Sequence, residues 1–219
     1  MSLDLSVLIA SCDSSLYSCM WKPFQICFDR YWKRDTDNII VTEQEIVPQY
    51  TNTKFATCAP GVLPWGQRII KGLEECSSDN VFFIMEDYLF FHTYSPEQMG
   101  RYLELVARHN IKRLQIAPSG HQTYTDEKTD GLTRFSDNSD YLVSMQPSIF
   151  NRQWLLDILE PSWTPWDFEI RGSRLLKYKH NKIYIDQSVP EVYFNAIRRG
   201  GKRSLGYKEF FEREGLEWI

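Results

Sequence analysis

The sequence lacks the short motifs by which several large enzyme classes are recognised. It contains no GxxxxGK(S/T) stretch, and no GxGxxG follows its first apolar run. These absences argue against a P-loop enzyme and against a standard dinucleotide binder. Neither a Gly-x-Ser-x-Gly elbow nor an HExxH stretch occurs, so the usual signs of an α/β-hydrolase and of a zinc peptidase are missing as well.

Cysteine is scarce, and long hydrophobic runs are absent. The chain has five cysteines, none spaced as CxxC, which argues against structural zinc and against a disulfide framework. Reduced thiols in the cytoplasm are the expected state. The first apolar run, residues 5–10, is too short for a signal peptide or a membrane span. We therefore expect a cytoplasmic protein without a transmembrane segment, and contact with the periphery of a membrane stays open.

Length and charge narrow the class further. The 219 residues suffice for one large α/β domain with a substantial core. A net charge of −4 argues against a general nucleic-acid binder. Aromatic residues make up 15% of the chain, a high share that indicates stacking surfaces in addition to core.

The order of apolar and polar segments predicts alternating strands and helices. Strands are predicted at residues 5–11, 38–42, 54–58, 81–85, 111–116, 141–145 and 182–185. Helices are predicted from Pro23, from Pro64, from Pro96 after the cap Ser95, over 152–159, between a loop at 163–169 and Lys179, and after Tyr207. The polar stretch 118–139 is predicted to be a loop. This alternation favours a sheet with helices on both faces, with 5–11 and 81–85 as interior strands because both are continuously apolar.

Two adjacent acids, Glu86 and Asp87, end the apolar run 81–85. In open α/β sheets, ligands bind just outside the carboxyl ends of the strands. Ionised carboxylates are costly to bury unpaired, and a divalent cation held against a phosphorylated ligand would explain both acids. The alternative is that they simply cap the strand in solvent.

Five segments, taken in order, resemble the GT-A glycosyltransferases, in particular the small ones of bacterial surface-polysaccharide clusters and of a large algal virus. The segments are CDSSLYSCMWKPFQICFDRYW with Asp13 and Trp21, PWGQRIIKGLE with Trp65 and Arg68, FIMEDYLF, SMQPSIFNRQWL with Ser144 and Gln146, and PWDFEIRGS with Glu169. Together they span roughly residues 5 to 175. One departure concerns the acids: the family usually has two aspartates, whereas here Glu86 takes the first place and Tyr88 follows directly, which leaves the need for a metal open.

The resemblance implies a fold and an activity. The fold would be a single GT-A (Rossmann-like) domain over 1–219, a mostly parallel twisted sheet flanked by helices, with a nucleotide-binding half at about 1–92 and an acceptor-binding half at about 93–219. The activity would be transfer of a sugar from a nucleotide-diphosphate donor, a UDP- or dTDP-sugar, to a hydroxyl of a glycan acceptor with inversion.

The same resemblance assigns roles to residues. The donor would be bound by Ser11, Asp13, Trp65, Arg68 and Glu86. Outside the matched segments, Arg199 and Lys202 of the basic run 198–203 could close over the diphosphate, with glycines as hinges. Asp87 would bind Mn²⁺ or Mg²⁺, and Glu169 would be the general base, with Asp167 in reserve. Plainer readings exist for most of these: Arg68 in a surface ion pair, the basic run 198–203 as a solvated turn, and both Asp167 and Glu169 as acids that complement a helix dipole.

Two other functions stay open. A sugar-nucleotide nucleotidyltransferase would share the α/β class, but it usually needs a glycine-rich basic loop after the first strand, and residues 12–20 contain no Gly, Lys or Arg. A non-catalytic carbohydrate-binding domain would use aromatics such as Trp163, Trp166 and Phe168 as a stacking platform. The same three side chains are equally well explained as core.

Overall fold

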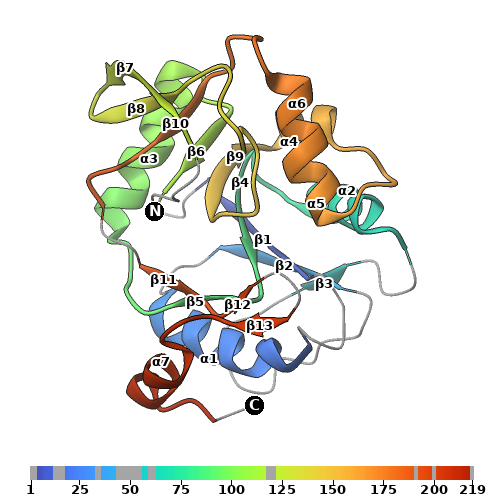
Figure 1. Ribbon diagram of the computed structural model, residues 1–219, viewed down its shortest axis with the longest axis vertical. Coiled ribbons are helices and arrows are strands. Elements are labelled where there is room, and N and C mark those ends of the chain that lie inside the picture. The colour runs from blue at the N-terminus through green and yellow to red at the C-terminus, as the bar shows by residue number, and fades with distance from the viewer. Residues whose placement is uncertain are drawn as a thin grey trace.

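A mixed sheet runs through the middle of the protein (Figure 1). The computed structural model describes residues 4–11, 18–32, 36–42, 56–58, 63–116, 122–189, 192–198 and 201–217. Within these ranges, nine strands follow the order β3-β2-β1-β4-β9-β6-β10-β8-β7. Their bounds are β1 Ser6–Ala10, β2 Asp37–Val41, β3 Ala56–Cys58, β4 Asn80–Met85, β6 Arg113–Gln115, β7 Tyr124–Thr129, β8 Leu132–Phe135, β9 Ser148–Asn151 and β10 Ile183–Ile185. Seven of the nine point the same way, and only β8 and β9 are reversed, so the mostly parallel sheet is confirmed.

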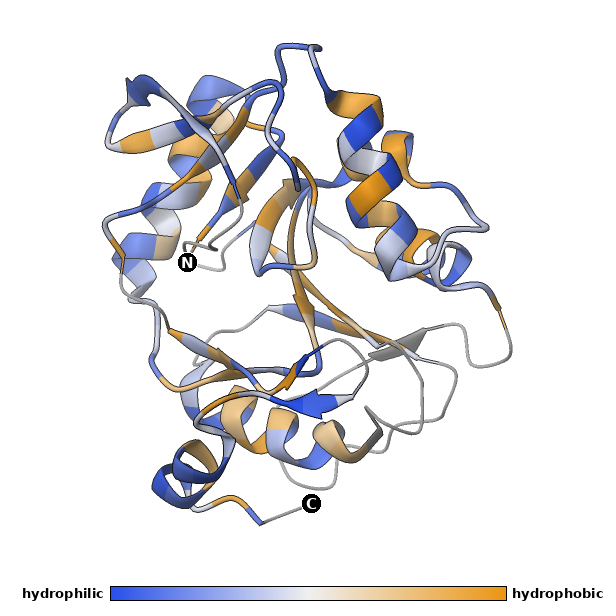
Figure 2. Cartoon of the chain, viewed as in Figure 1, coloured by the Kyte–Doolittle hydropathy of each residue, from blue (hydrophilic) through white to orange (hydrophobic). Residues whose placement is uncertain are grey.

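The two apolar runs occupy the centre of the sheet, as predicted. Strand β1 lies between β2 and β4, and β4 lies between β1 and β9. Every residue of β1 is buried, as are all residues of β4 after Asn80. Figure 2 shows the same concentration of hydrophobic residues along the central strands. Strands buried on both faces need apolar side chains at successive positions, which is why these runs do not alternate with polar residues.

Helices cover both faces of the sheet. The main ones are α1 Trp21–Tyr31, α2 Trp65–Glu75, α3 Pro96–His109, α4 Arg152–Ile158 and α7 Tyr207–Glu214. Trp32, at the end of α1, stacks on Phe82 of β4 with ring centroids 5.1 Å apart. Gly72 of α2 packs against Leu8 of β1, and Leu8 is in register with Phe83. Because Phe82 and Phe83 point to opposite faces, α1 and α2 lie on opposite sides. No helix in the described ranges is long and apolar enough to cross a membrane.

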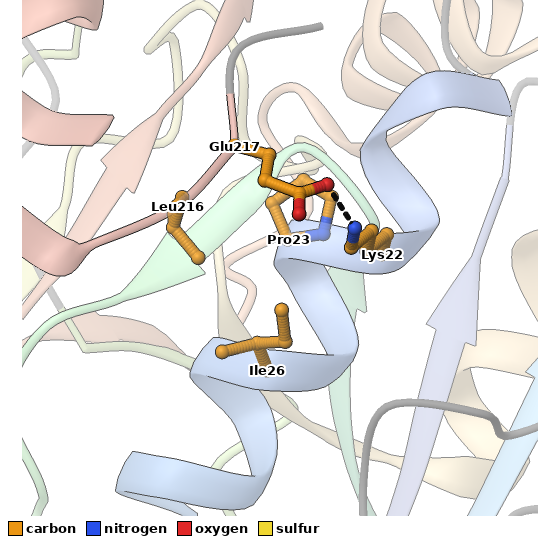
Figure 3. Close-up of a pocket in the computed structure, with 5 residues that line it drawn as sticks. All are labelled: Lys22, Pro23, Ile26, Leu216 and Glu217. Carbon is orange, nitrogen blue, oxygen red and sulfur yellow. Dashed lines mark hydrogen bonds and ion pairs between the residues drawn. The ribbon is translucent and has the colours of Figure 1, made fainter. Parts of the chain in front are cut away.

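The C-terminal segment returns to the carboxyl end of β4. Strand β5, Tyr88–Phe90, pairs with β11, Tyr193–Asn195, and a short hairpin follows, formed by β12, Ile197–Arg198, and β13, Lys202–Arg203. Helix α7 then docks on α1 (Figure 1), where Glu214 accepts hydrogen bonds from Arg30 Nη1 at 3.0 Å and from Tyr31 Oη at 2.7 Å. Figure 3 shows a small pocket between α1 and the chain after α7, where two of the lining residues, Lys22 and Glu217, form an ion pair.

The predicted loop over 118–139 is wrong for residues 124–135, which form a hairpin. Strands β7 and β8 are joined by Asp130 and Gly131, whose φ angles of 49° and 88° are both positive. An Asp-Gly pair with positive φ at both positions makes the tight turn that matches the twist of a hairpin. Tyr124 and Phe135 pack edge to face across the hairpin, 5.1 Å apart. The Asp-Gly pair is a hairpin signal that can be seen in the sequence. It does not enter the prediction because the residues before it are mostly polar and do not resemble a strand.

The predicted strand at 141–145 is also wrong, and the neighbouring segment Ser148–Asn151 forms β9 instead. Backbone groups of 141–145 are bound by side chains rather than by a neighbouring strand. Arg113 donates to the carbonyls of Tyr141 and Leu142, and the Ser173 hydroxyl bonds to both N and O of Val143. The segment is apolar because it is buried, although it forms no hydrogen-bonded ladder with another strand. A short apolar run looks the same in the sequence in both cases.

The packing at the start of α2 gives a stability prediction. Gly66 N–H donates to the Trp163 carbonyl at 2.9 Å, and a Cβ at Gly66 would lie only 2.2 Å from the Glu160 carbonyl oxygen. Gly66→Ala should therefore lower the free energy of unfolding by about 1–3 kcal/mol, the usual cost of overpacking. Gly100→Ala is the control: it lies in α3 with nothing within 4 Å of the added Cβ, and it should stabilise by about 0.5–1 kcal/mol. Urea unfolding measures both variants. If Gly66→Ala and Gly100→Ala changed the free energy of unfolding equally, the close approach of Gly66 to the Glu160 carbonyl would not contribute to stability.

Candidate functional site

The acidic turn, Glu86–Asp87, lies where β4 ends beside β1. Ala10 of β1 is in register with Met85 of β4, and Glu86 N–H donates to the Ala10 carbonyl at 3.2 Å. Ser11 Oγ donates to Glu86 Oε1 at 2.8 Å, and both side chains are buried. The structure therefore brings together two residues assigned to the donor from sequence. The alternative that these acids are solvent-exposed caps is excluded, because Glu86 is 0% and Asp87 6% exposed.

The buried environment of Asp87 disfavours the ionised form of its side chain. Burial disfavours the ionised carboxylate and raises the pKa of Asp87 from 3.8 to about 7. Its carbonyl accepts a hydrogen bond from Ala196 N–H at 2.8 Å. Ala196 directly precedes β12, so the basic hairpin with Lys202 starts beside the acidic turn. Lys202 itself is exposed. Asp13 and Arg199, two other residues assigned to the donor, lie outside the described residues.

Gln146 connects the acidic turn to the segment before β9. Its amide donates from Nε2 to Tyr88 Oη at 2.9 Å, and its Oε1 accepts from Tyr193 Oη at 2.5 Å. Tyr88 directly follows Asp87. The neighbouring residue Met145 donates its N–H to Glu169 Oε1 at 2.8 Å. This chain of contacts places Glu169 at the same end of the sheet as Asp87, although 82 positions separate them in the sequence.

Glu169 and Asp167 differ in what they do in the structure. They belong to one helical stretch formed by α5, Pro165–Asp167, the π-helical η2, Phe168–Gly172, and α6, Ser173–Leu176, so the loop predicted over 163–169 is already helical from Pro165. Asp167 forms a capping box with Thr164, and these hydrogen bonds lower its pKa. Glu169 is half-buried, and burial raises its pKa. Asp167 thus caps the helix, whereas Glu169 accepts from Met145 N–H and takes no part in the cap.

Arg113 was not identified from the sequence, yet it organises the segment between β8 and β9. It is fully buried on β6. Its five N–H groups point at five neutral oxygens: Ser148 Oγ, the carbonyls of Tyr141 and Leu142, Gln115 Oε1 and Ser144 Oγ, at 2.6–3.3 Å. None of these acceptors carries a charge, so burial lowers the pKa of Arg113 to about 9, and the negative charge of Glu169 works against this lowering. The hint in the sequence is an arginine inside the predicted strand 111–116, where it alternates with apolar residues only in part.

The aromatic residues around α2 divide between core and surface. Trp65 is buried and packs on Phe168 with ring centroids 5.9 Å apart. Trp163 is buried as well, so these rings belong to the core and do not form an open stacking platform. Trp166 is 42% exposed. Arg68 is only 2% exposed on the buried side of α2, which excludes a surface ion pair as its role.

The hydrogen bonds of Arg113 predict a large loss of stability when the guanidinium is replaced. Lysine has three donors and no planar fork, so Arg113→Lys should leave buried carbonyls unsatisfied and cost about 2–4 kcal/mol. The control is Arg108→Lys, at a position where the side chain is 53% exposed and pairs with Glu104 and Asp130; its loss should stay below about 1 kcal/mol. Urea unfolding measures both. Similar small losses would mean that Arg113 does not hold segment 141–148.

Comparison with known proteins gives matches to solved structures. No protein-family model matches the chain, and a search of curated proteins finds no match. Residues 1–349 of S. aureus TarS, a GT-A glycosyltransferase, superpose with a TM-score of 0.51 at 13% identity, over 88% of this chain and 59% of that one. The TarS complex with UDP-GlcNAc gives 0.52 at 12% identity, over 100% and 62%.

CMP:2-keto-3-deoxy-manno-octonic acid synthetase complexed with CTP also gives a TM-score of 0.52 at 12% identity, over 86% of this chain and 90% of the synthetase. The chain thus spans about three fifths of the TarS 1–349 structures, but nearly all of the synthetase. Identities this low establish the fold alone, and by that measure the chain has the GT-A-like, Rossmann-related fold expected from its sequence.

Proposed function

We propose that the protein is a glycosyltransferase that moves a sugar from a UDP- or dTDP-sugar to a hydroxyl of a glycan acceptor in the cytoplasm, with inversion. The observation that carries the proposal is the meeting of three elements at one end of the sheet. These are Ser11 paired with Glu86, the buried Asp87, and Glu169 held by the segment that Gln146 joins to Tyr88. Support also comes from the fold, which TarS shares and which in TarS has been seen with UDP-GlcNAc.

The donor would lie outside the carboxyl ends of β1 and β4, where open α/β sheets bind nucleotides. Ser11 and Asp13 follow β1 and offer oxygens to the base N–H or ribose hydroxyls. Arg68 belongs to α2, which packs on β1 and β2, and a guanidinium there is suited to phosphate. Trp65, at the start of the same helix, would support this position from the core, where it packs on Phe168. Lys202, on the hairpin that starts beside Asp87, would add positive charge around the diphosphate, and so would Arg199 of the same basic run.

The acidic turn fits a cation that is shared with the diphosphate. Among the described residues, no three His, Cys, Asp or Glu side chains gather as a metal site. The carboxylate of Asp87 is the candidate ligand, because Glu86 Oε1 accepts from Ser11. Asn195 Oδ1, on β11 opposite Tyr88, is buried with no hydrogen-bond partner in the described part of the chain. Such oxygen donors suit Mg²⁺ or Mn²⁺, with phosphate oxygens completing the shell. A bound cation would offset the charge of the leaving diphosphate.

Glu169 would take the proton of the acceptor hydroxyl as that oxygen attacks the anomeric carbon from the face opposite the diphosphate. A base in this role needs a fixed position and a pKa closer to neutrality than that of an exposed acid. The hydrogen bond from Met145 N–H fixes one carboxylate oxygen. Burial raises the pKa of Glu169, while that hydrogen bond and the charge of Arg113 oppose the rise.

Glu169→Gln should leave donor binding nearly unchanged and lower the transfer rate by about 10²–10⁴-fold, the usual contribution of a positioned base. Asp167→Asn is the matched control and should cost mainly stability, about 0.5–2 kcal/mol for a weakened cap. The wild-type rate should fall as the pH drops through the raised pKa of Glu169, and the Gln variant should lose this part of the pH dependence while the part that Asp87 contributes remains. Initial rates with each UDP- and dTDP-sugar measure these effects; the reverse ranking of the variants would move the role to Asp167.

Asp87→Asn should remove the metal-linked part of nucleotide binding. In the wild type, UDP and Mn²⁺ together should raise the melting temperature more than the sum of either alone, because each completes the other's site. Asp87→Asn should abolish this extra rise, whereas Asp79→Asn, at the other end of β4 and 85% exposed, should retain it. An undiminished metal-linked rise in the Asp87 variant would remove Asp87 from the site.

A sugar-nucleotide nucleotidyltransferase is the second candidate, because the synthetase bound to CTP matches this chain over 90% of its own length. That activity would release pyrophosphate from a nucleoside triphosphate and a sugar. Glycosyl transfer would instead release UDP or dTDP from the nucleotide-sugar. Assaying both products separates the two reactions, and a carbohydrate-binding domain would give neither.

A further inference from the structure

Exposed apolar side chains gather on one part of the surface. Within the described ranges, six large hydrophobic side chains are exposed, and five of them come from Tyr141 and the stretch 166–178. These five, here called the apolar patch, are Tyr141, Trp166, Ile170, Leu175 and Tyr178, which are 36%, 42%, 46%, 50% and 74% exposed. The sixth, Leu205, follows the β12–β13 hairpin. Scattered exposed apolar residues are ordinary, but a contiguous group marks a binding surface.

The two segments that carry the apolar patch are joined by contacts. Trp166 and Ile170 lie one turn apart on the α5–η2–α6 stretch, whose other side is buried through Phe168 and Leu176. Two contacts tie the end of this stretch to the segment that carries Tyr141. Lys177 Nζ lies 3.0 Å from Asp140 Oδ1, and Tyr178 N–H donates to the Asp137 carbonyl at 3.0 Å.

Cations are interleaved with the apolar side chains. Arg171, Arg174 and Lys179 are all exposed. Between positions 166 and 179 the sequence has four Lys or Arg residues and two acids, although the whole chain carries a net charge of −4. Of the two acids, Asp167 lies 3.6 Å from Arg171, and Glu169 turns inward to Met145 N–H. The helical stretch that carries Trp166, Ile170 and Leu175 therefore has two more cations than acids, although Lys177 is paired with Asp140 of the neighbouring segment.

We infer that the apolar patch docks the protein on an anionic phospholipid surface. A helix that exposes Trp, Ile and Leu together with Arg and Lys has the composition of interfacial helices: aromatic and aliphatic groups enter the headgroup boundary, and the cations meet lipid phosphates. Arg and Lys stems extend along apolar surface while their charged ends stay at the headgroups. A protein partner fits less well, because the centres of protein interfaces are depleted of charged residues.

Docking through this helix would turn the end of the sheet that holds Glu169 toward the lipid. The inference does not depend on the proposed function, because lipid binding can be measured without any sugar transfer. If the proposed function also holds, the acceptor is one presented at the membrane surface.

Co-sedimentation with vesicles tests the inference on the full chain. Vesicles of phosphatidylcholine containing phosphatidylglycerol should bind the wild-type protein, vesicles of phosphatidylcholine alone should bind it weakly, and added salt should reduce binding. The triple variant Trp166→Ser, Ile170→Ser, Leu175→Ser should lower the partition coefficient by on the order of 10- to 100-fold. Arg171→Gln with Arg174→Gln should lower it by about tenfold or more on anionic vesicles only.

Leu205→Ser is the matched control: it removes an exposed apolar side chain, 91% accessible, outside the patch, and it should leave binding unchanged. Circular dichroism should show the variants folded, since every substituted side chain is on the surface. The inference fails if the wild type does not bind anionic vesicles, if binding ignores lipid charge, or if Leu205→Ser is as damaging as the triple variant. It also fails if the triple variant abolishes a dimer seen by light scattering, because the patch would then bind a second copy of the chain.

Discussion

The register between β1 and β4 is the constraint on which the candidate site depends. Because Ala10 is level with Met85, both strands end together and the chain continues as Ser11 on one side and Glu86 on the other. A carboxylate buried at 0% exposure needs hydrogen bonds, and the hydroxyl of Ser11 provides one. A shift of one residue would turn Leu8 and Ile9 to the opposite faces and would separate this pair. The apolar side chains that fix the core therefore also fix the acidic turn.

A second constraint acts from the other half of the sheet. The segment 141–146 has no strand partner, and its backbone groups are bound by Arg113, Ser173 and Glu169. Burying a guanidinium among neutral oxygens is costly, and the lowered pKa of Arg113 reflects that cost. In return, the segment holds one geometry, which presents Gln146 to Tyr88 and Met145 to Glu169. Two acids that are distant in the sequence thereby come to flank one end of the sheet.

The sequence predicts those parts of the structure whose causes are local. The strands β1 and β4 follow from unbroken apolar runs, and α3 follows from Ser95, whose hydroxyl accepts from Gln98 N–H at 3.1 Å. The errors arise where the partner lies far along the chain. No residue near 141–145 in the sequence indicates that Arg113, and not a neighbouring strand, binds the backbone carbonyls of this segment. In the same way, the sequence cannot show that Asp167 caps the helix while Glu169 binds Met145 N–H, because Met145 lies more than twenty positions away. The β7–β8 hairpin is different, because Asp130-Gly131 was a local signal that the polar composition outweighed.

The central claim is that the acidic turn and Glu169 belong to one site for a nucleotide-sugar. A crystal structure of the protein with UDP and Mn²⁺ tests it most directly. The account predicts UDP at the carboxyl ends of β1 and β4, with its ribose near Ser11, its diphosphate beside Asp87, and Glu169 facing the open side of the β-phosphate. A nucleotide bound away from Asp87, or with its diphosphate directed away from Glu169, would contradict it.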